Sequence, residues 1–221
     1  MLARLQLLQL LSPQLPIGSY SYSQGLEWAV AEGWIEEAST LRSWLEELIR
    51  GPLAQQDLPL LKVLYQTADN ADKEAFDYWS QRALAFRDTA ELRLEERARA
   101  EAYLRVFAAL PLPSHSDFTT ALSRTPLACV AWAAAQWKID PADLLPAWAH
   151  NWLESSVING VKIIPLGQSQ GQQLLHSLLP AVSEAVEIAQ CLDVECIGFS
   201  TPALSAASCR HELQHTRIFR S

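Results

Sequence analysis

Two histidines near the end of the chain have the spacing of a zinc site. Residues 211–215 read His-Glu-Leu-Gln-His, so on a helix His211 and His215 would lie one turn apart, with Glu212 available as a general base. A catalytic zinc needs a third protein ligand, and only six residues follow His215. Cys209 is the nearby side chain that could complete the set. A zinc-dependent hydrolase is therefore kept as the alternative hypothesis, against a solvated polar helix face.

A glycine-flanked serine gives a second pattern found in hydrolases. Residues 167–171 read Gly-Gln-Ser-Gln-Gly, the spacing of a nucleophile elbow around Ser169. They follow residues 161–167, which read as a strand or as part of a broken helix. The elbow requires a multi-stranded parallel sheet, and residues 194–199 are the one other strand candidate. The pattern therefore favours a helix start that uses glycine and polar caps.

The two common phosphate-binding patterns are both absent. The chain contains neither GxxxxGK[ST] nor GxGxxG, so we expect it to bind no nucleotide by either route. Any nucleotide chemistry then belongs to a partner, and we expect no cofactor on this chain.

Composition narrows the class of protein further. The 221 residues carry 17 Lys+Arg against 25 Asp+Glu, a net charge of -8, which disfavours nucleic-acid binding. Hydrophobic residues make up 49%, enough for a core without disulfides. The four cysteines show no CxxC spacing, and Cys129 and Cys191 stand among alanine and leucine as small buried residues do. We expect a reducing cytoplasm.

Neither apolar segment predicts a membrane span or a signal peptide. The N-terminal MLARLQLLQLL is followed by Ser12, Pro13 and Gln14 instead of a small-residue cleavage site, which predicts a short amphipathic helix. The longest apolar run, residues 126–137, is well short of the roughly 20 residues that a span needs. We expect no contact with a membrane.

Alanine, leucine, glutamate and glutamine dominate, and alternating β-branched runs are scarce. The sequence therefore predicts an all-α fold, a single-domain helical bundle over residues 1–221 with about nine or ten helices. After the N-terminal helix we expect helices at residues 23–33, 39–50, 53–68, 72–86, 88–105, 125–137, 141–160, 168–192 and 202–216.

Three of these helices carry more specific expectations. The helix at 39–50 should begin at Ser39 or Thr40 and end at Gly51-Pro52. The helix at 88–105 alternates acids with arginines at i,i+4 spacing, which predicts a solvated helix. The helix at 168–192 places a stripe of apolar residues on one face, which must lie on a neighbour: Leu175, Leu178, Val182, Ala185 and Ala189.

Two segments have a composition that is unusual for connections. The loop at residues 12–25 combines proline, glycine and serine with Ile17, Tyr20 and Tyr22. The tail at 210–221 combines three arginines with Phe219, which is the composition of binding hot spots, although such a tail is also often a frayed end. Lys162 stands alone in an apolar run, so it either reaches solvent or needs a buried partner.

Four stretches of the chain resemble the urease accessory protein UreF family. They are SPQLPIGSYSYSQGLEWA at 12–29, FRDTAELRLEE at 86–96, VKIIPLGQSQGQ at 161–172 and RHELQHTRIFRS at 210–221. The resemblance implies an all-helical cytoplasmic protein with no catalysis of its own. Such a protein forms a homodimer and joins UreD (also called UreH) and the GTPase UreG in a complex that loads nickel into apo-urease.

The resemblance also implies which residues bind partners. In the family, the N-terminal loop and the C-terminal tail serve binding of the UreD-type protein, and the dimer surface presents UreG. On this chain the matching positions are Gly18, Tyr22, Ser23, Gly25 and Glu27 in the loop motif, and Arg210, His211, Glu212, Arg217, Phe219 and Arg220 in the tail motif.

The chain departs from the family pattern at several positions. His215 stands where the family has tyrosine, which makes the zinc-like spacing an accident of one substitution. Ser169 stands where threonine is usual, which weakens the nucleophile-elbow interpretation in the same way. Phe86 and Asp88 replace a serine and a glutamate, and Ser155 replaces an asparagine.

Overall fold

The computed structural model describes residues 1–221, and all of its regular structure is helical. The predicted all-α class is confirmed, and the eleven α-helices, one of them only four residues long, are close to the expected number. They are α1 Leu2–Leu10, α2 Leu26–Ala31, α3 Ala38–Leu48, α4 Leu58–Asp69, α5 Lys73–Ala85, α6 Ala90–Phe107, α7 Thr119–Leu122, α8 Pro126–Gln136, α9 Pro141–Ile163, α10 Gln168–Cys191 and α11 Pro202–His211.

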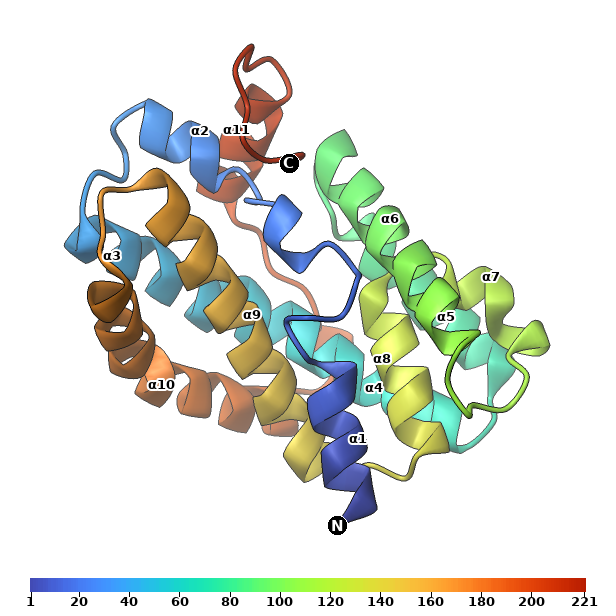
Figure 1. Cartoon of the computed structure of the whole chain (residues 1–221). Helices are drawn as coiled ribbons and strands as arrows, with labels where there is room; N and C mark the ends of the chain where they lie inside the picture. Colours follow the sequence, from blue (N-terminus) through green and yellow to red (C-terminus); the bar gives the residue numbers. More distant parts are fainter.

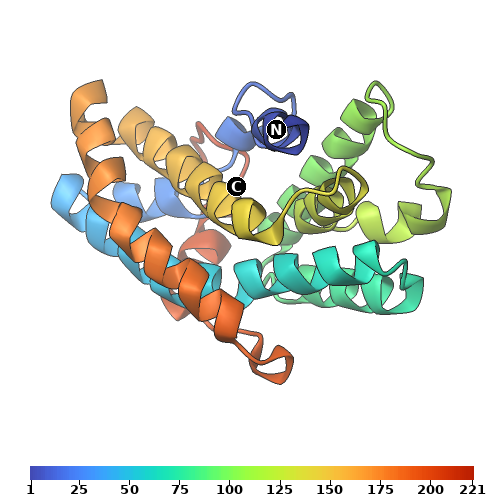
Figure 2. The ribbon, with the colours of Figure 1, turned by 90° about the horizontal axis from the view of Figure 1, so that it is seen from below.

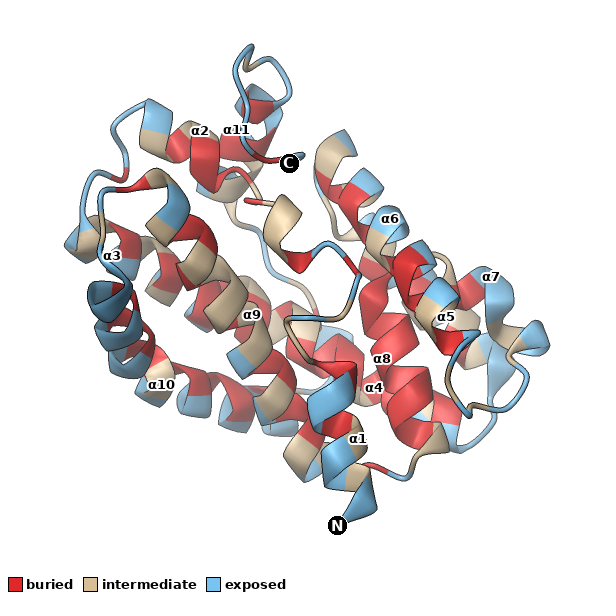
Figure 3. Ribbon diagram, in the orientation of Figure 1, coloured by how far each residue is buried: buried red, intermediate tan, exposed pale blue.

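Helix α8 lies between α4 and α6 (Figure 1). Every residue from Pro126 to Ala135 is buried, because alanine side chains let α4 and α6 pack closely on both sides. Figure 3 shows α8 almost entirely in the colour of buried residues, while α1 and α10 each expose one face. The apolar run that is too short for a membrane span is therefore the core helix.

Helices α9 and α10 pack on each other. Helix α10 also packs on α3 and on a π-helical stretch, Ile49–Asp57. Seen from below, α9 and α10 lie on one side and α5 to α7 on the other (Figure 2). The apolar stripe predicted on α10 is confirmed, since all five of its residues are buried.

The helix expected to end at Gly51-Pro52 does not end there. The chain continues through the π-helical stretch, which begins at Ile49 and leads directly into α4. A π-helical turn accommodates a proline that cannot donate an α-helical hydrogen bond. Gly51 is buried against the ring of Phe199, and a Cβ there would lie 2.5 Å from a ring carbon. The glycine serves a close packing contact and does not stop the helix.

Helix α6 is less solvated than its charge pattern predicts. Glu95 and Glu96 are 2% and 4% exposed, and Glu96 bonds Arg87, whose guanidinium also lies 3.0 Å from Asp57. Burial raises the pKa of Glu96, and the charge of Arg87 opposes that shift. Spacing along one helix shows partners within that helix only, whereas Arg87 and Asp57 come from outside it.

Other expectations are corrected at the ends of elements. Residues 161–163 form the last turn of α9, and residues 194–199 begin as a 3₁₀ turn, so neither strand candidate is a strand. Cys191 is exposed because it is the last residue of α10, where the buried face has ended. The last helix, α11, ends at His211 instead of residue 216. None of the helices combines the length and apolarity needed to cross a membrane.

Candidate functional site

The loop before α2 and the tail after α11 meet beside the start of α6 (Figure 1). The carbonyl oxygen of Ser221 accepts hydrogen bonds from the backbone N–H groups of Ser23 at 2.5 Å and Gln24 at 3.0 Å, and from the Ser23 hydroxyl at 2.8 Å. The backbone N–H of Arg220 donates to Ser21 at 2.8 Å. We call residues 18–27 together with residues 210–221 the clasp.

Glu27, the second residue of α2, anchors the tail from within the clasp. One carboxylate oxygen accepts from the backbone N–H of Ile218 at 2.6 Å and the other from that of Phe219 at 2.9 Å. Glu27 is 6% exposed and Phe219 4% exposed. Hydrogen bonds to a charged acceptor contribute about 1.5–3 kcal/mol each, so this one side chain holds the tail in place.

His211 joins three elements at the centre of the clasp. Its Nε2 lies 3.2 Å from Glu27 of α2 and its Nδ1 lies 2.7 Å from Glu91 of α6. The other oxygen of Glu91 accepts from Arg217 at 2.6 Å, and Arg217 also donates to the Glu212 carbonyl at 2.6 Å. The His211 side chain is fully buried.

Glu95 closes the clasp one helical turn further along α6. It accepts from the Gln24 side chain, from Arg99 and from the Ser221 hydroxyl, each at 3.0 Å. Neither Glu91 nor Glu95 was singled out from the sequence, because both lie in the helix that the charge pattern predicts to be solvated. The i,i+4 spacing predicts the ion pair of Glu95 with Arg99, which the structure confirms at 3.0 Å, but not the contacts of either glutamate with the clasp. For those contacts the signal is position within the stretch at 86–96 that resembles the UreF family.

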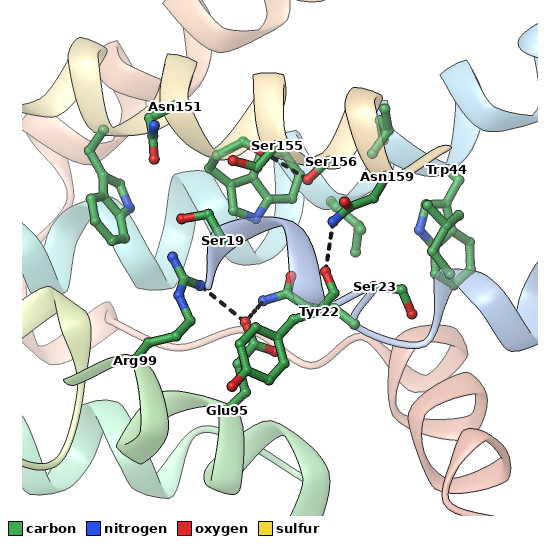
Figure 4. A pocket seen from close by; sticks show the side chains of 16 residues that line it. Ser19, Tyr22, Ser23, Trp44, Glu95, Arg99, Asn151, Ser155, Ser156 and Asn159 are labelled. Atoms are coloured by element: carbon green, nitrogen blue, oxygen red, sulfur yellow. Dashed lines mark hydrogen bonds and ion pairs between the residues drawn. The ribbon is translucent and has the colours of Figure 1, made fainter. Parts of the chain in front are cut away.

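A small polar pocket adjoins the inner side of the clasp (Figure 4). Arg99 and Glu95 of α6 face Ser155, Ser156 and Asn159 of α9 across the loop, whose Ser19 and Tyr22 lie between them. The Asn159 side chain donates to the Tyr22 carbonyl at 2.7 Å. The loop is therefore held on both of its sides, by α6 and by α9.

Lys162 finds its partners in the clasp as well. Its ammonium donates to the Tyr20 carbonyl at 3.2 Å and lies over the rings of Tyr20 and Phe219, at 5.1 Å and 5.5 Å from their centroids. Partial burial lowers the pKa of Lys162. The lysine that stands out in an apolar run thus ties α9 to both segments of the clasp.

Gly25 shows why the loop motif needs glycine at that position. Its φ is +81°, and a Cβ there would lie 2.8 Å from the backbone nitrogen of Ser208 in α11. Gly25 therefore permits both the left-handed turn before α2 and the close contact of α2 with α11.

The residues expected to bind partners separate into two groups in the structure. Ser23, Gly25, Glu27, His211 and Phe219 are buried and hold the clasp together, and Tyr22 is half-buried. The exposed members are Gly18, Arg210, Glu212, Arg217 and Arg220. The structure brings both motifs to one place. Glu212 and Arg217 also bond Glu91 of α6, so the members that can contact another protein without breaking a side-chain bond of the clasp are Gly18, Arg210 and Arg220.

A groove with a mixed lining of aromatic, apolar and charged side chains, which sequence reasoning missed, borders the clasp. We call it the tryptophan groove: Trp28 and Trp34 pack edge to face at 4.9 Å, and the lining continues with Arg210, Leu213 and His215. Trp34, Leu213 and the nearby Ile218 of the clasp are 46%, 73% and 70% exposed. No sequence period connects these residues, because they come from different elements.

The structure contradicts both catalytic patterns. Since α11 ends at His211, His215 does not lie one helical turn away but is exposed in the tail, and both ring nitrogens of His211 face carboxylates. No group of three or more His, Cys, Asp or Glu side chains is placed to hold a metal ion. Ser169 is exposed in the first turn of α10, in a molecule without a sheet, so it does not form a nucleophile elbow.

Known proteins are similar in sequence to this chain along its length. The UreF family model matches residues 35–179, and full-length relatives extend the similarity to both segments of the clasp. The protein named urease accessory protein UreF from Alcanivorax borkumensis is 42% identical over 222 residues, covering 98% of this chain and 97% of its own length.

Proteins with the same name from other bacteria are similar over the same extent. The one from Pseudomonas putida KT2440 is 43% identical over 220 residues, covering 100% of this chain and 98% of its own length. The one from Escherichia coli O157:H7 is 37% identical over 218 residues, covering 99% of this chain and 97% of its own length. This chain belongs to the UreF family of urease accessory proteins.

Proposed function

We propose that this chain is a non-catalytic, dimeric assembly factor that acts in the cytoplasm. It links a UreG-type GTPase and a UreD/UreH-type accessory protein to apo-urease, and so modulates the GTP-dependent insertion of nickel. Nucleotide and nickel are carried by partners or pass along the complex. The observation that carries the proposal is similarity along the whole chain to proteins named urease accessory protein UreF, with both terminal motifs of the chain joined in one clasp.

The geometry of the clasp supports two separate roles for its residues: the buried ones hold the tail, and the exposed ones contact the partner. The buried carboxylate of Glu27 and the buried ring of His211 fix the path of the tail. The fixed tail then presents Arg210, Arg217 and Arg220 beside exposed apolar side chains. Arginines next to apolar anchors are the composition of interface hot spots, and we assign this surface, with the tryptophan groove, to the UreD-type partner.

The charge of the clasp supports the same assignment. Three arginines gather in the tail of a chain whose net charge is -8, so the surface differs in charge from the average of the molecule. Complementary charge raises the association rate and sets orientation more than it adds affinity. An acidic and apolar patch on the partner fits this surface.

The test is reconstitution of the complex from purified components. We expect the chain, of 24.6 kDa, to run at twice its mass in light scattering, and to co-elute with the UreD-type and UreG-type partners. Glu27→Ala should abolish co-elution with the UreD-type partner while the helical content stays unchanged. A chain that remains alone with both partners present would contradict the proposal.

The non-catalytic part of the proposal needs its own test. The isolated chain, supplied with zinc or nickel, should hydrolyse no ester or peptide substrate. Hydrolysis that disappears with His211→Ala would overturn this part.

A further inference from the structure

His211 is held between two carboxylates that belong to different helices. Glu27 of α2 faces its Nε2 and Glu91 of α6 faces its Nδ1, and the ring has no exposed surface. Two further charged groups of the tail lie at the site: Arg217 pairs with the second oxygen of Glu91 at 2.6 Å, and the Glu212 carboxylate accepts from the backbone N–H of Glu91 at 3.3 Å. The residues that flank His211 in the chain, Arg210 and Glu212, are exposed.

This geometry relates the number of protons on the ring to the charge of the two carboxylates. An ionised carboxylate only accepts hydrogen bonds, so both ring nitrogens have to donate for both contacts to form. While both carboxylates are ionised, a ring that forms both contacts is an imidazolium, and the positive charges of His211 and Arg217 face the negative charges of Glu27, Glu91 and Glu212. A neutral ring has one N–H and one lone pair, so it can serve only one of the two carboxylates.

The two contacts differ in length, which indicates which one is lost first. Nδ1 lies 2.7 Å from Glu91 and Nε2 lies 3.2 Å from Glu27, so a single remaining proton stays on the side of Glu91. The lone pair of Nε2 would then face the Glu27 oxygen that accepts from the backbone of Phe219. Repulsion at that oxygen acts directly on the side chain that anchors the tail.

We infer that the clasp is a proton-dependent latch: it is closed while His211 carries both ring protons, and it releases the tail when Nε2 loses its proton. The consequence of tail release for partner docking rests on the function proposed above.

The first test reads the ring directly in the wild-type chain. Nitrogen NMR of protein labelled in its five histidines, with the signals assigned by substituting the other four, distinguishes a doubly protonated ring from a neutral one. We expect both nitrogens of His211 to be protonated at pH 6.5 and Nε2 to lose its proton as the pH rises to 9. A ring with a single proton at pH 6.5 would overturn the inference, and this reading does not depend on a variant folding.

The second test measures release of the tail by trypsin cleavage after Arg217, normalised to an unstructured reporter peptide in the same tube. Cleavage of the opened state follows its population, so we expect a normalised rate about tenfold higher at pH 9 than at pH 6.5. His211→Gln should be cleaved quickly at both pH values, whereas the matched control His215→Gln, at an exposed histidine of the same tail, should behave as wild type. Equal wild-type rates at the two pH values, or a pH dependence kept by His211→Gln, would refute the latch.

Titration of the UreD-type partner at the same two pH values separates the latch from the function on which it acts. Weaker binding of the partner at pH 9 supports both the latch and the assignment of the clasp as the docking surface. Tail release with unchanged binding supports the latch and contradicts the assignment of the clasp as the docking surface.

Discussion

Gly25 combines two requirements that a side chain cannot meet: its φ is +81°, and a Cβ at this position would lie 2.8 Å from the backbone nitrogen of Ser208. Gly33 has a similar φ of +74°, but a Cβ there would meet only the flexible end of Glu36, at 3.3 Å. Substituting each glycine in turn therefore distinguishes the cost of a strained backbone from the cost of a steric conflict with a neighbouring helix.

We predict that Gly25→Ala costs about 2 kcal/mol or more of unfolding free energy, and that Gly33→Ala costs about 1 kcal/mol, which is the cost of the left-handed backbone alone. Urea unfolding of the two variants measures the difference. Equal losses would mean that α11 does not press on Gly25.

Cys129 is buried in the first half of α8, and the other three cysteines are exposed. Burial raises the pKa of the Cys129 thiol, which suppresses the reactive thiolate. We predict that a thiol reagent at neutral pH modifies three cysteines in the folded chain and all four after denaturation. Four fast reactions in the folded chain would contradict the position of α8 in the core.

At the scale of elements, the sequence best predicts burial where the apolar pattern repeats within a single helix. The stripe on α10 repeats within a single helix and is buried as predicted. The clasp could not be predicted in this way, because Glu27 meets Phe219 across 192 residues of chain. Composition and family resemblance marked the two segments, but no local pattern indicates that they pack together.

The tail contains no regular helix beyond His211, yet Phe219 and Ser221 are buried. We predict that deleting residues 212–221 leaves the helical content unchanged and lowers the unfolding free energy by about 5 kcal/mol, the combined value of the buried Phe219 side chain and the two backbone hydrogen bonds to Glu27. Circular dichroism with urea titration measures both quantities. A large loss of helix would show that the tail supports the core of the protein and not only the clasp.

At the scale of the whole molecule, one cluster of 54 buried residues connects α1 with α11. A continuous core of this kind predicts that the chain unfolds as a single domain. Melting curves followed by far-ultraviolet and near-ultraviolet circular dichroism should coincide. Two separated transitions would show that α9 and α10 unfold independently of α4 and α8.

The central claim is that the surface of the clasp is the docking site for the UreD-type partner. Calorimetric titration of that partner into two double variants tests it, since Leu213 and Ile218 lie on this surface, and Leu5 and Leu8 are similarly exposed on α1. Changing the first pair to serine should weaken binding by about tenfold or more, because both anchors are lost. Changing the second pair should leave the affinity within about twofold. Equal affinities for the two variants would contradict the account.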